Sequence, residues 1–452
     1  MIPEQQKVID GALALHKQQR FGEAEAEYHK ILNQEPEDPG LLYLLADIYL
    51  RRDWDGLAGI LLTQLLKKYP NHSQAWCNLG IAHRKENRLD VAKAAWERAL
   101  AIAGDSEEVC NNMAGLYADM AQPKEAMAWC DRALKVNPES VSGQWHKALA
   151  LLTLGRFEEG WPLYKSRQKK EGWHARDSVV APEWDGKPVE RLYIHGEQGV
   201  GDEIMFASAI PHILGLVGHV TVEVNAKVAG IVKQTWPQFT VVKDESAVTG
   251  HFDAKIPIGN LIGMFGMNTK PFLEPHPEKV AFYRRELEKL GPGPYVALTW
   301  IGGTKQTRIG TRSMDLGDLS PIMDRYTCVS AQYSQTPALA ELIGRQLAKH
   351  GLRKINDESA GEDLHDQAAL FKAVDAVVTV QQTAVHVAGG VGAKTLALID
   401  TNPHWRYGVS VDTMPFYSSV SLLRKKTGWN EVVERALHAL ERDIPGLKRE
   451  AA

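Results

Sequence analysis

Three glycine-rich loops carry residue types that could hold a phosphorylated ligand and move a proton. The first, HGEQGVGDE at 195–203, follows the apolar run RLYIH and precedes a helical pattern. Its glycines let the backbone approach a ligand closely and leave amides free at a helix start. Asp202 and Glu203 have two interpretations. They are carboxylates favoured by the helix dipole, or one of them is a general base acting on an acceptor hydroxyl at the edge of a cleft.

The second loop, GGTKQTRIGTRS at 302–313, combines a Gly-Gly pair with hydroxyls and cations. Lys and Arg side chains beside flexible backbone amides suit a diphosphate, whose charge must be neutralised when it departs as a leaving group. A solvated basic loop is the alternative. The candidate residues are Lys305, Arg308, Arg312 and Ser313.

The third loop, QQTAVHVAGG at 381–390, opens a helix after the apolar run DAVVTV. Gln381, Gln382 and Thr383 lie near the predicted N-cap, where exposed amides can bind phosphate or ribose. His386 is either a hydrogen-bonded core residue or a ligand contact. Gly389 and the glycine after it permit close packing of this helix on a sheet.

All three loops follow predicted strands of an α/β region that begins near residue 190. Short β-rich runs alternate there with helical ones, which indicates parallel α/β units. The predicted strands span 191–195, 219–224 and 239–244 in a first half, and 295–301, 326–333, 375–380 and 395–400 in a second. GPGP at 291–294 separates the halves, and a helix is expected at 429–442. Two such halves facing each other form a cleft at the carboxyl ends of their strands.

The first third of the chain contains an internal repeat of 34 residues. Small residues recur in two registers, larger residues in a third, and Pro or Gly in a fourth. The small registers are Ala24, Ala58, Ala92, Ala126 and Gly160, and Ala12, Ala46, Gly80, Ala114 and Ala148. The larger register is Tyr28, Leu62, Trp96, Cys130 and Tyr164, and the fourth is Pro36, Pro70, Gly104 and Pro138. Small residues let paired helices approach closely, and the Pro or Gly ends each second helix.

This pattern resembles the tetratricopeptide repeat, with about four copies over residues 5–140 and a fifth from 141 to about 170. Cys110 and Cys130 fall on packing positions and are expected to be buried thiols. Solenoids of this kind use their concave face to hold peptides or protein surfaces, so a protein partner is expected there. Self-association through the same face is the alternative.

The composition excludes several classes of protein. Of the 452 residues, 44% are hydrophobic and 24% charged, which is ordinary for a globular protein, and the formal charge of −4 gives no basic bias toward nucleic acid. The four cysteines form no CxxC pair, so no zinc site is expected. The N-terminus lacks the basic start and apolar core of a signal peptide, and no stretch is apolar enough for a membrane span. A cytoplasmic location is therefore expected.

Four segments in order resemble the bacterial proteins that join tetratricopeptide repeats to a domain similar to glycosyltransferase family 9, the heptosyltransferase family. They are HGEQGVGDEIMFA from 195, TWIGGTKQTRIGTRS from 299, VTVQQTAVHVAGGVGAKTLALI from 378 and NPHWRYGVSVDTMPFYSSVSLLRK from 402. The resemblance implies an α + α/β chain in which the solenoid precedes a GT-B-like pair of Rossmann-like halves. The expected segments are the repeat domain 1–170, a linker 171–189, an acceptor-side half 190–290 and a donor-side half 291–452.

The resemblance also implies roles for residues. Asp202 matches the family's expected base. Together with the residues singled out from the loops themselves, the expected donor-binding residues are Gly199, Gly201, Lys305, Arg308, Arg312, Ser313, Gln381, Gln382, Thr383, His386 and Gly389. Trp405, Arg406 and Tyr407 follow a predicted strand and are candidate contacts to the base or sugar; a packed loop anchored by aromatic rings is the alternative.

One position departs from the family. Five residues before the helix His, heptosyltransferases usually carry Asp followed by Ser or Thr, where this chain has Gln381 and Gln382. An amide can still hydrogen-bond a sugar hydroxyl or a phosphate, but it brings no charge. The donor identity therefore does not carry over from the family.

The predicted function is a glycosyltransferase that uses a nucleotide-sugar, inverts the anomeric centre and requires neither metal nor cofactor. The repeats are expected to dock the acceptor, a protein such as a surface or flagellar subunit. The alternative is a catalytically inactive repeat adaptor with a degenerate nucleotide-binding module. A different α/β transferase with an activated phosphate donor is a third hypothesis.

Overall fold

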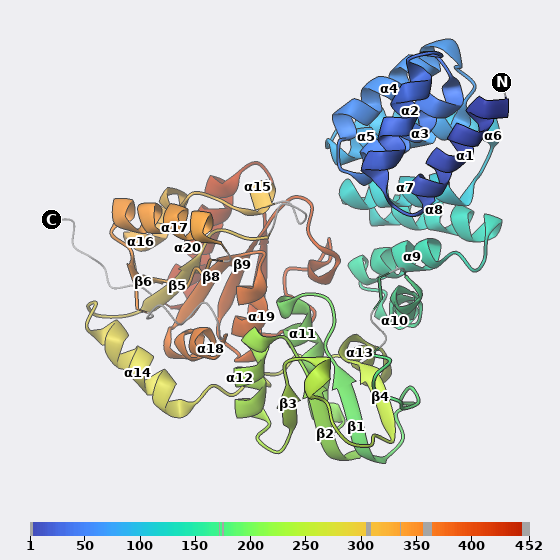
Figure 1. The fold of residues 1–452 in the computed structure, drawn as a ribbon. Coiled ribbons are helices and arrows are strands. Elements are labelled where there is room, and N and C mark those ends of the chain that lie inside the picture. Colours follow the sequence, from blue (N-terminus) through green and yellow to red (C-terminus); the bar gives the residue numbers. More distant parts are fainter. Residues whose placement is uncertain are drawn as a thin grey trace. The chain divides into compact units, whose positions relative to one another are not determined.

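The computed structural model describes residues 3–170, 172–173, 176–303, 309–334, 336–355 and 364–444. The chain divides into two compact units, Met1–Leu151 and Leu152–Ala452 (Figure 1). The described part of the first unit is built from helices, and the second combines helices with two parallel sheets. This agrees with the predicted order of a helical solenoid followed by an α/β region.

The helices of the first unit come in pairs that recur every 34 residues. The pairs are α1 (Pro3–Lys17) with α2 (Phe21–Leu32), α3 (Pro39–Arg51) with α4 (Asp55–Lys68), α5 (Ser73–Lys85) with α6 (Leu89–Ala103), and α7 (Glu107–Asp119) with α8 (Pro123–Val136). The 34-residue spacing continues along the chain with α9 (Val141–Thr153) and α10 (Phe157–Tyr164). The division between the units falls within α9, so α10 belongs to the second unit.

The predicted packing registers are buried in the structure. Gly80 shows why small residues are needed, because a Cβ there would lie 2.4 Å from Nε1 of Trp96. The Trp96 ring is fully buried, and its N–H donates to the Cys77 carbonyl at 2.9 Å. Cys110 and Cys130 are buried free thiols, and burial raises the pKa of Cys130 to about 12. These cysteines therefore serve as packing residues.

The first sheet has four parallel strands in the order β3-β2-β1-β4. They are β1 (Val189–His195), β2 (Val217–Glu223), β3 (Thr240–Val242) and β4 (Ala254–Pro257), with helices α11 (Val200–Ala207), α12 (Ala226–Thr235) and α13 (Ile258–Phe265) between or after them. β1, β2 and β3 match predicted strands. β4 was missed because its sequence, AKIP, is short and contains both Lys and Pro.

The second sheet has six parallel strands in the order β10-β9-β8-β5-β6-β7. They are β5 (Tyr295–Thr299), β6 (Thr327–Ser330), β7 (Arg353–Lys354), β8 (Ala376–Val380), β9 (Thr395–Ile399) and β10 (Val420–Arg424). The helices are α14 (Pro277–Glu288), α15 (Ile309–Arg312), α16 (Ser320–Met323), α17 (Pro337–His350), α18 (Leu364–Ala373), α19 (Thr383–Gly390) and α20 (Trp429–Asp443).

The central strands of this sheet were predictable from the sequence. Every residue of β5, β8 and β9 is buried, as expected for parallel strands covered on both faces. The helix expected at 429–442 is α20. β7 and β10 were missed because the first has only two residues and the second lies in a segment with mixed polarity.

Two segments pack on parts of the structure that their positions in the sequence did not predict. Within the predicted linker, the described part packs on the first sheet: Trp184 N–H donates to the Lys255 carbonyl at 2.9 Å, and Arg176 pairs with Glu223 at 2.7 Å. Helix α14 precedes the GPGP break, yet it packs on α18 of the second half. Lys279 on α14 is paired there with Asp366 at 2.7 Å.

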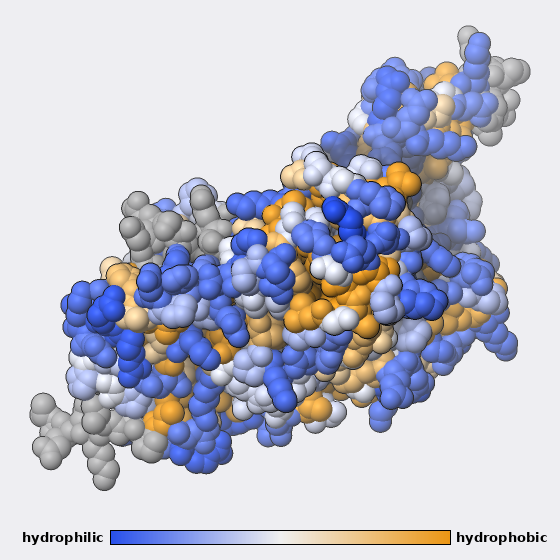
Figure 2. All heavy atoms as spheres, turned by 90° about the horizontal axis from the view of Figure 1, so that it is seen from below, coloured by the Kyte–Doolittle hydropathy of each residue, from blue (hydrophilic) through white to orange (hydrophobic). Residues whose placement is uncertain are grey.

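The surface seen in Figure 2 is mainly hydrophilic, with apolar residues gathered near the middle of the view. Within the part of the chain that the structure describes, no helix has both the length and the apolar character needed to cross a bilayer.

Candidate functional site

A pocket of about 350 Å³ lies within the second unit, at the carboxyl ends of strands from both sheets. Gly199–Asp202 follow β1, Ile301 and Gly303 follow β5, Gln332 and Tyr333 follow β6, Gln381–Thr383 follow β8, and Arg406 and Tyr407 follow β9. Crevices at this end of parallel strands are where α/β folds bind ligands. The pocket is therefore the candidate functional site.

The pocket brings together most of the residues singled out from the sequence. Those that line it are Gly199, Gly201, Asp202, Arg312, Gln381, Gln382, Thr383, His386, Arg406 and Tyr407. Gln332, Tyr333 and Leu339 also line it and were missed. The signal for Gln332 was its place at the end of a predicted strand, but it stands outside any glycine-rich loop. Lys305 and Arg308 lie outside the described residues.

Three predicted residues do not line the pocket but shape its surroundings. The Ser313 hydroxyl accepts from Gly302 N–H at 3.1 Å and so holds the loop after β5. Gly389 makes room for Tyr417, because a Cβ there would lie 2.3 Å from the ring. Trp405 is buried against Trp161, with ring centroids 5.8 Å apart, and this fits the packed aromatic loop that the sequence left open.

Helices α11 and α19 both begin at this pocket. The two helices approach each other closely (Figure 1). Gly201 in the first turn of α11 faces His386 of α19, and a Cβ at Gly201 would lie 3.0 Å from the imidazole Cδ2. No side chain caps the start of α19, whose N-cap residue is Gln382. Helix N-termini carry partial positive charge and free amides, so both helices favour an anion in the pocket.

His386 is a neutral, hydrogen-bonded residue. Its Nδ1 lies 3.1 Å from the Tyr417 hydroxyl, and burial lowers the pKa of the imidazole to about 3. The imidazole is therefore uncharged at neutral pH and supplies no positive charge to a ligand.

The two members of the acidic pair have different environments. Asp202 lines the pocket and forms an ion pair with Arg406; its other oxygen accepts from Gly199 N–H at 3.3 Å, which caps α11. Glu203 is buried beside α12 and accepts from Asn225 N–H at 2.9 Å. Desolvation raises the pKa of Glu203 to about 7. Only Asp202 is therefore placed to meet a ligand in the pocket.

Arg406 is held from several sides. Its Nη1 lies 2.8 Å from His404 Nδ1, and its guanidinium lies over the Trp405 ring at 5.2 Å. Burial lowers the pKa of Arg406 from its ordinary value. The guanidinium Nε is buried and has no hydrogen-bond partner.

The three glutamines of the pocket differ in their hydrogen bonding. Gln332 accepts from the N–H groups of Trp300 and Ile301 at 2.9 Å each and donates to two carbonyls at 3.1 Å. Gln381 is 1% exposed, and neither its amide oxygen nor its nitrogen has a partner. The nitrogen of Gln382 is also unpaired. Because buried polar groups are nearly always satisfied in folded proteins, the unpaired amides point to a ligand.

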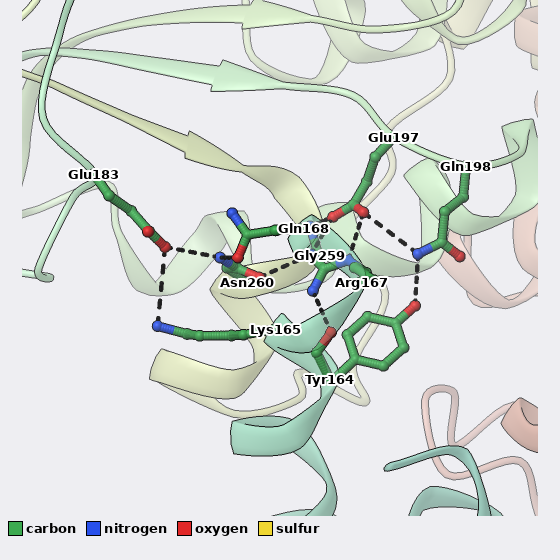
Figure 3. A network of polar contacts seen from close by, with 9 residues as sticks. All are labelled: Tyr164, Lys165, Arg167, Gln168, Glu183, Glu197, Gln198, Gly259 and Asn260. Carbon is green, nitrogen blue, oxygen red and sulfur yellow. Dashed lines mark hydrogen bonds and ion pairs between the residues drawn. The ribbon is translucent and has the colours of Figure 1, made fainter. Parts of the chain in front are cut away.

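A second polar cluster holds the loop that leads into α11 (Figure 3). Arg167 and Glu197 form an ion pair at 2.5 Å in which both side chains are 4% exposed. Figure 3 shows Asn260 and Gly259 completing this cluster: Asn260 accepts from Arg167 at 2.8 Å and Gly259 N–H donates to Glu197 at 2.9 Å. The cluster fixes the segment just before Gly199.

The same loop contains a strained residue. Gln198 has a φ of 64°, in the left-handed region that non-glycine residues rarely adopt. Its side-chain amide donates to the Tyr164 hydroxyl of α10 at 2.7 Å. The last helix of the repeat pattern therefore helps to set the conformation of the loop that enters the pocket.

Among the described residues, no group of three His, Cys, Asp or Glu side chains lies close enough together to hold a metal ion. That the protein needs no metal or cofactor stays a prediction.

Comparisons with known proteins support the repeat region directly. Tetratricopeptide-repeat models match residues 9–53 and 83–152. Protein FlbA of Caulobacter vibrioides is 30% identical over 384 residues, which cover 78% of this chain and 64% of FlbA. The chain is thus a homologue of FlbA that spans just under two thirds of its length.

Solved structures also resemble the chain. A thermophilic TPR protein of Thermus thermophilus is 19% identical, with 37% of this chain and 91% of that chain covered and a TM-score of 0.33. The pilF protein of Pseudomonas aeruginosa is 17% identical, with 38% and 78% covered and a TM-score of 0.35. With its helix pairs, its 34-residue period and the two family matches, the N-terminal region of this chain is a tetratricopeptide-repeat solenoid.

Proposed function

We propose that the α/β region is a GT-B glycosyltransferase that moves a sugar from a nucleotide-sugar to a hydroxyl group of a protein held by the repeats. The observation that carries this proposal is the pocket, where loops after five parallel strands gather around two helix N-termini. Its described lining contains one carboxylate, Asp202, and two guanidinium groups, Arg312 and Arg406. This combination suits a base beside a diphosphate.

The donor diphosphate would lie at the start of α19. The first amides of that helix have no side-chain cap, and the helix dipole favours negative charge there. Arg312 and Arg406 on the pocket wall would neutralise the charge that develops on the diphosphate as it leaves. In this proposal the protein's own cations take the place of a metal ion.

Asp202 would act as the general base. It takes the proton of the acceptor hydroxyl while the acceptor oxygen forms its bond to the anomeric carbon of the donor. The bond from that carbon to the diphosphate oxygen breaks at the same time, and the nucleoside diphosphate leaves with the electron pair. Attack from the opposite face of the sugar inverts the anomeric centre.

The repeats indicate a protein partner, because tetratricopeptide solenoids bind peptides and protein surfaces. Joined to a transferase, they would dock the acceptor, and a surface or flagellar subunit fits this arrangement. Self-association through the repeats is the competing use of the same face.

A second candidate function is a repeat adaptor whose α/β region binds a nucleotide without catalysing transfer. The ion pair of Asp202 with Arg406 favours it, because a carboxylate engaged by a guanidinium is a poor base. The two candidates differ in whether transfer occurs, and both require a ligand in the pocket.

The test combines binding with transfer. Purified protein is screened by thermal shift against UDP, GDP, ADP, CMP and TDP without added metal, since a ligand that binds the native state raises its stability. Transfer from the matching nucleotide-sugar is then measured for wild type, Asp202→Asn and Glu203→Gln. Glu203 is the matched control, because it is the neighbouring carboxylate and does not line the pocket.

We expect Asp202→Asn to lose transfer by roughly 10²-fold or more, as for the loss of a general base, and Glu203→Gln to retain it. Nucleotide binding without transfer in the wild type would favour the adaptor. Full activity of Asp202→Asn would overturn the role of Asp202.

A further inference from the structure

The ion pair between Asp202 and Arg406 joins two residues that the proposed reaction needs apart. Asp202 comes from the first turn of α11 and Arg406 from the loop after β9, and both line the pocket. A base must present its carboxylate to the acceptor. A guanidinium that stabilises a diphosphate must present its N–H groups to the donor. In this structure the two side chains instead form an ion pair with each other.

The surroundings of the pair favour an exchange of partners. The side chains of Asp202 and Arg406 are 16% and 11% exposed, so both are reachable from the pocket. The Nε of Arg406 has no hydrogen-bond partner, which leaves one edge of the guanidinium unused. Arginine binds carboxylate and phosphate with the same forked geometry, so a phosphate oxygen can occupy the place that an Asp202 oxygen holds.

The charges of the pocket also favour an incoming anion. Asp202 is the one carboxylate in the described lining, and two helix N-termini and a second arginine face the same space. His386 is neutral because burial lowers its pKa to about 3. The aromatic ring of Trp405 and the His404 imidazole hold Arg406 in place. Outside the pair, Asp202 accepts from Gly199 N–H at 3.3 Å, and its second oxygen can keep this cap while the first leaves Arg406.

We propose that the carboxylate of Asp202 is a stand-in for the donor diphosphate on Arg406, and that binding of the diphosphate displaces it and frees it to act as the base. This inference rests on the proposed glycosyl transfer and deepens it. Arg406 then couples the two substrates: the base becomes available only when the donor is bound. The free enzyme has no competent base, so the donor binds before the acceptor reacts.

If the exchange occurs, Asp202→Asn should raise the affinity for an anion, whereas the loss of an ordinary site residue would lower it. Anion binding in the wild type includes breaking the ion pair, and Asp202→Asn removes that penalty. The variant should bind inorganic pyrophosphate about tenfold more tightly than wild type. In an Arg406→Gln background there is no ion pair to break, so Asp202→Asn should tighten pyrophosphate binding by threefold or less. This remaining effect measures the repulsion between the Asp202 carboxylate and the anion.

The experiment is a double-mutant cycle in the full-length protein, with calorimetric titration of inorganic pyrophosphate into wild type, both single variants and the double variant. Arg406→Lys is a second background that keeps the positive charge should the Arg406→Gln variant fold poorly; there the tightening should persist. Glu431→Gln controls for the loss of one negative charge, because Glu431 is paired with Arg435 on α20 and does not line the pocket. It should change the affinity less than twofold.

The outcomes separate this inference from the proposed function. Equal tightening in the wild-type and Arg406→Gln backgrounds, or none in either, overturns the exchange even when transfer is observed. Selective tightening with pyrophosphate, but no transfer from any nucleotide-sugar, supports the exchange and overturns the transferase. Absence of pyrophosphate binding in every variant overturns the exchange, and the transferase is then judged by the transfer assay alone.

Discussion

The cluster around Arg167 and the pocket around Arg406 each contain an arginine paired with a carboxylate, but the two regions differ in how completely their polar groups are used. Arg167 reaches both oxygens of Glu197, the Asn260 side chain and the Tyr164 carbonyl. Glu197 in turn accepts from the Gly259 amide. The guanidinium of Arg167 and the carboxylate of Glu197 therefore have hydrogen-bond partners on all their nitrogens and oxygens.

The pocket shows the reverse. The Nε of Arg406 and both polar atoms of Gln381 are buried without a hydrogen bond, although folded proteins satisfy nearly all such groups. Buried polar atoms without a partner also occur away from the pocket, as at Ser166 and Ser208. Within the pocket lining, however, hydrogen bonding separates Gln332, whose amide is fully bonded, from Gln381, whose amide is free to meet a ligand.

The largest effect on stability is expected at the ion pair between Arg167 and Glu197. Arg167→Met leaves Glu197 buried and without its cation, which should lower the free energy of unfolding by about 3–5 kcal/mol. Chemical denaturation followed by tryptophan fluorescence measures it. The control is Arg156→Met at the start of α10, whose partner Glu159 is 57% exposed; it should lose no more than about 1 kcal/mol. A similar small loss at Arg167 would contradict the structural role of the cluster.

Within the pocket, Gln332 provides the corresponding test of a hydrogen-bonded polar side chain. Gln332→Leu removes four hydrogen bonds to backbone groups, three of them buried, and should lower the free energy of unfolding by about 2–4 kcal/mol, from desolvation of the groups left unpaired. Thermal and chemical unfolding measure the loss. Unchanged stability would show that these backbone groups find other partners.

Glu203 tests a buried carboxylate whose pKa is raised mainly by desolvation. Its pKa is raised to about 7 in the folded protein against 4.5 in the unfolded chain, so the native state binds more protons between these values. Wild-type stability contributed by this group therefore falls as pH rises from about 4.5 to 7, by at most about 1.4 kcal/mol per pH unit. Glu203→Gln should match wild type near pH 4.5 and exceed it at pH 7.5. Parallel stability profiles for the two proteins would show that Glu203 titrates normally.

The smallest effect on stability is expected at Gln381. Gln381→Leu removes two polar atoms that have no partner, so the free energy of unfolding should change by less than about 1 kcal/mol. Nucleotide affinity should instead fall about tenfold, as for loss of one good ligand contact. A stability loss as large as that of Gln332→Leu would mean that Gln381 is a structural residue.

The repeat region was predictable from the sequence almost in full. Its contacts join neighbouring repeats, so the same packing demand recurs at each offset and becomes visible as a period. Ala58 and Trp96 could be assigned to the core for this reason, and both are fully buried. The strands β5, β8 and β9 were equally clear because burial on both faces makes them continuous apolar runs.

The candidate site was predictable as a set of loops but not as a set of contacts. Glycine-rich segments after strands identified Gly201, Gln381 and His386, which the fold gathers in one pocket. Nothing in the sequence separates the hydrogen bonding of Gln381 from that of Gln332, since both are glutamines at strand ends. Nor could it distinguish Asp202 from Glu203, which differ in the direction their side chains take from α11.

By itself, the sequence determined the repeat period, the succession of parallel strands and which loops stand at strand ends, because each of these is a local pattern of residue size and polarity. Only the tertiary structure decided that Arg167 pairs with Glu197 and that Arg406 pairs with Asp202, 204 positions away. Such pairs depend on which distant segments the two sheets bring to the same edge. The free energy of a buried charge is set by those neighbours, and no local pattern records them.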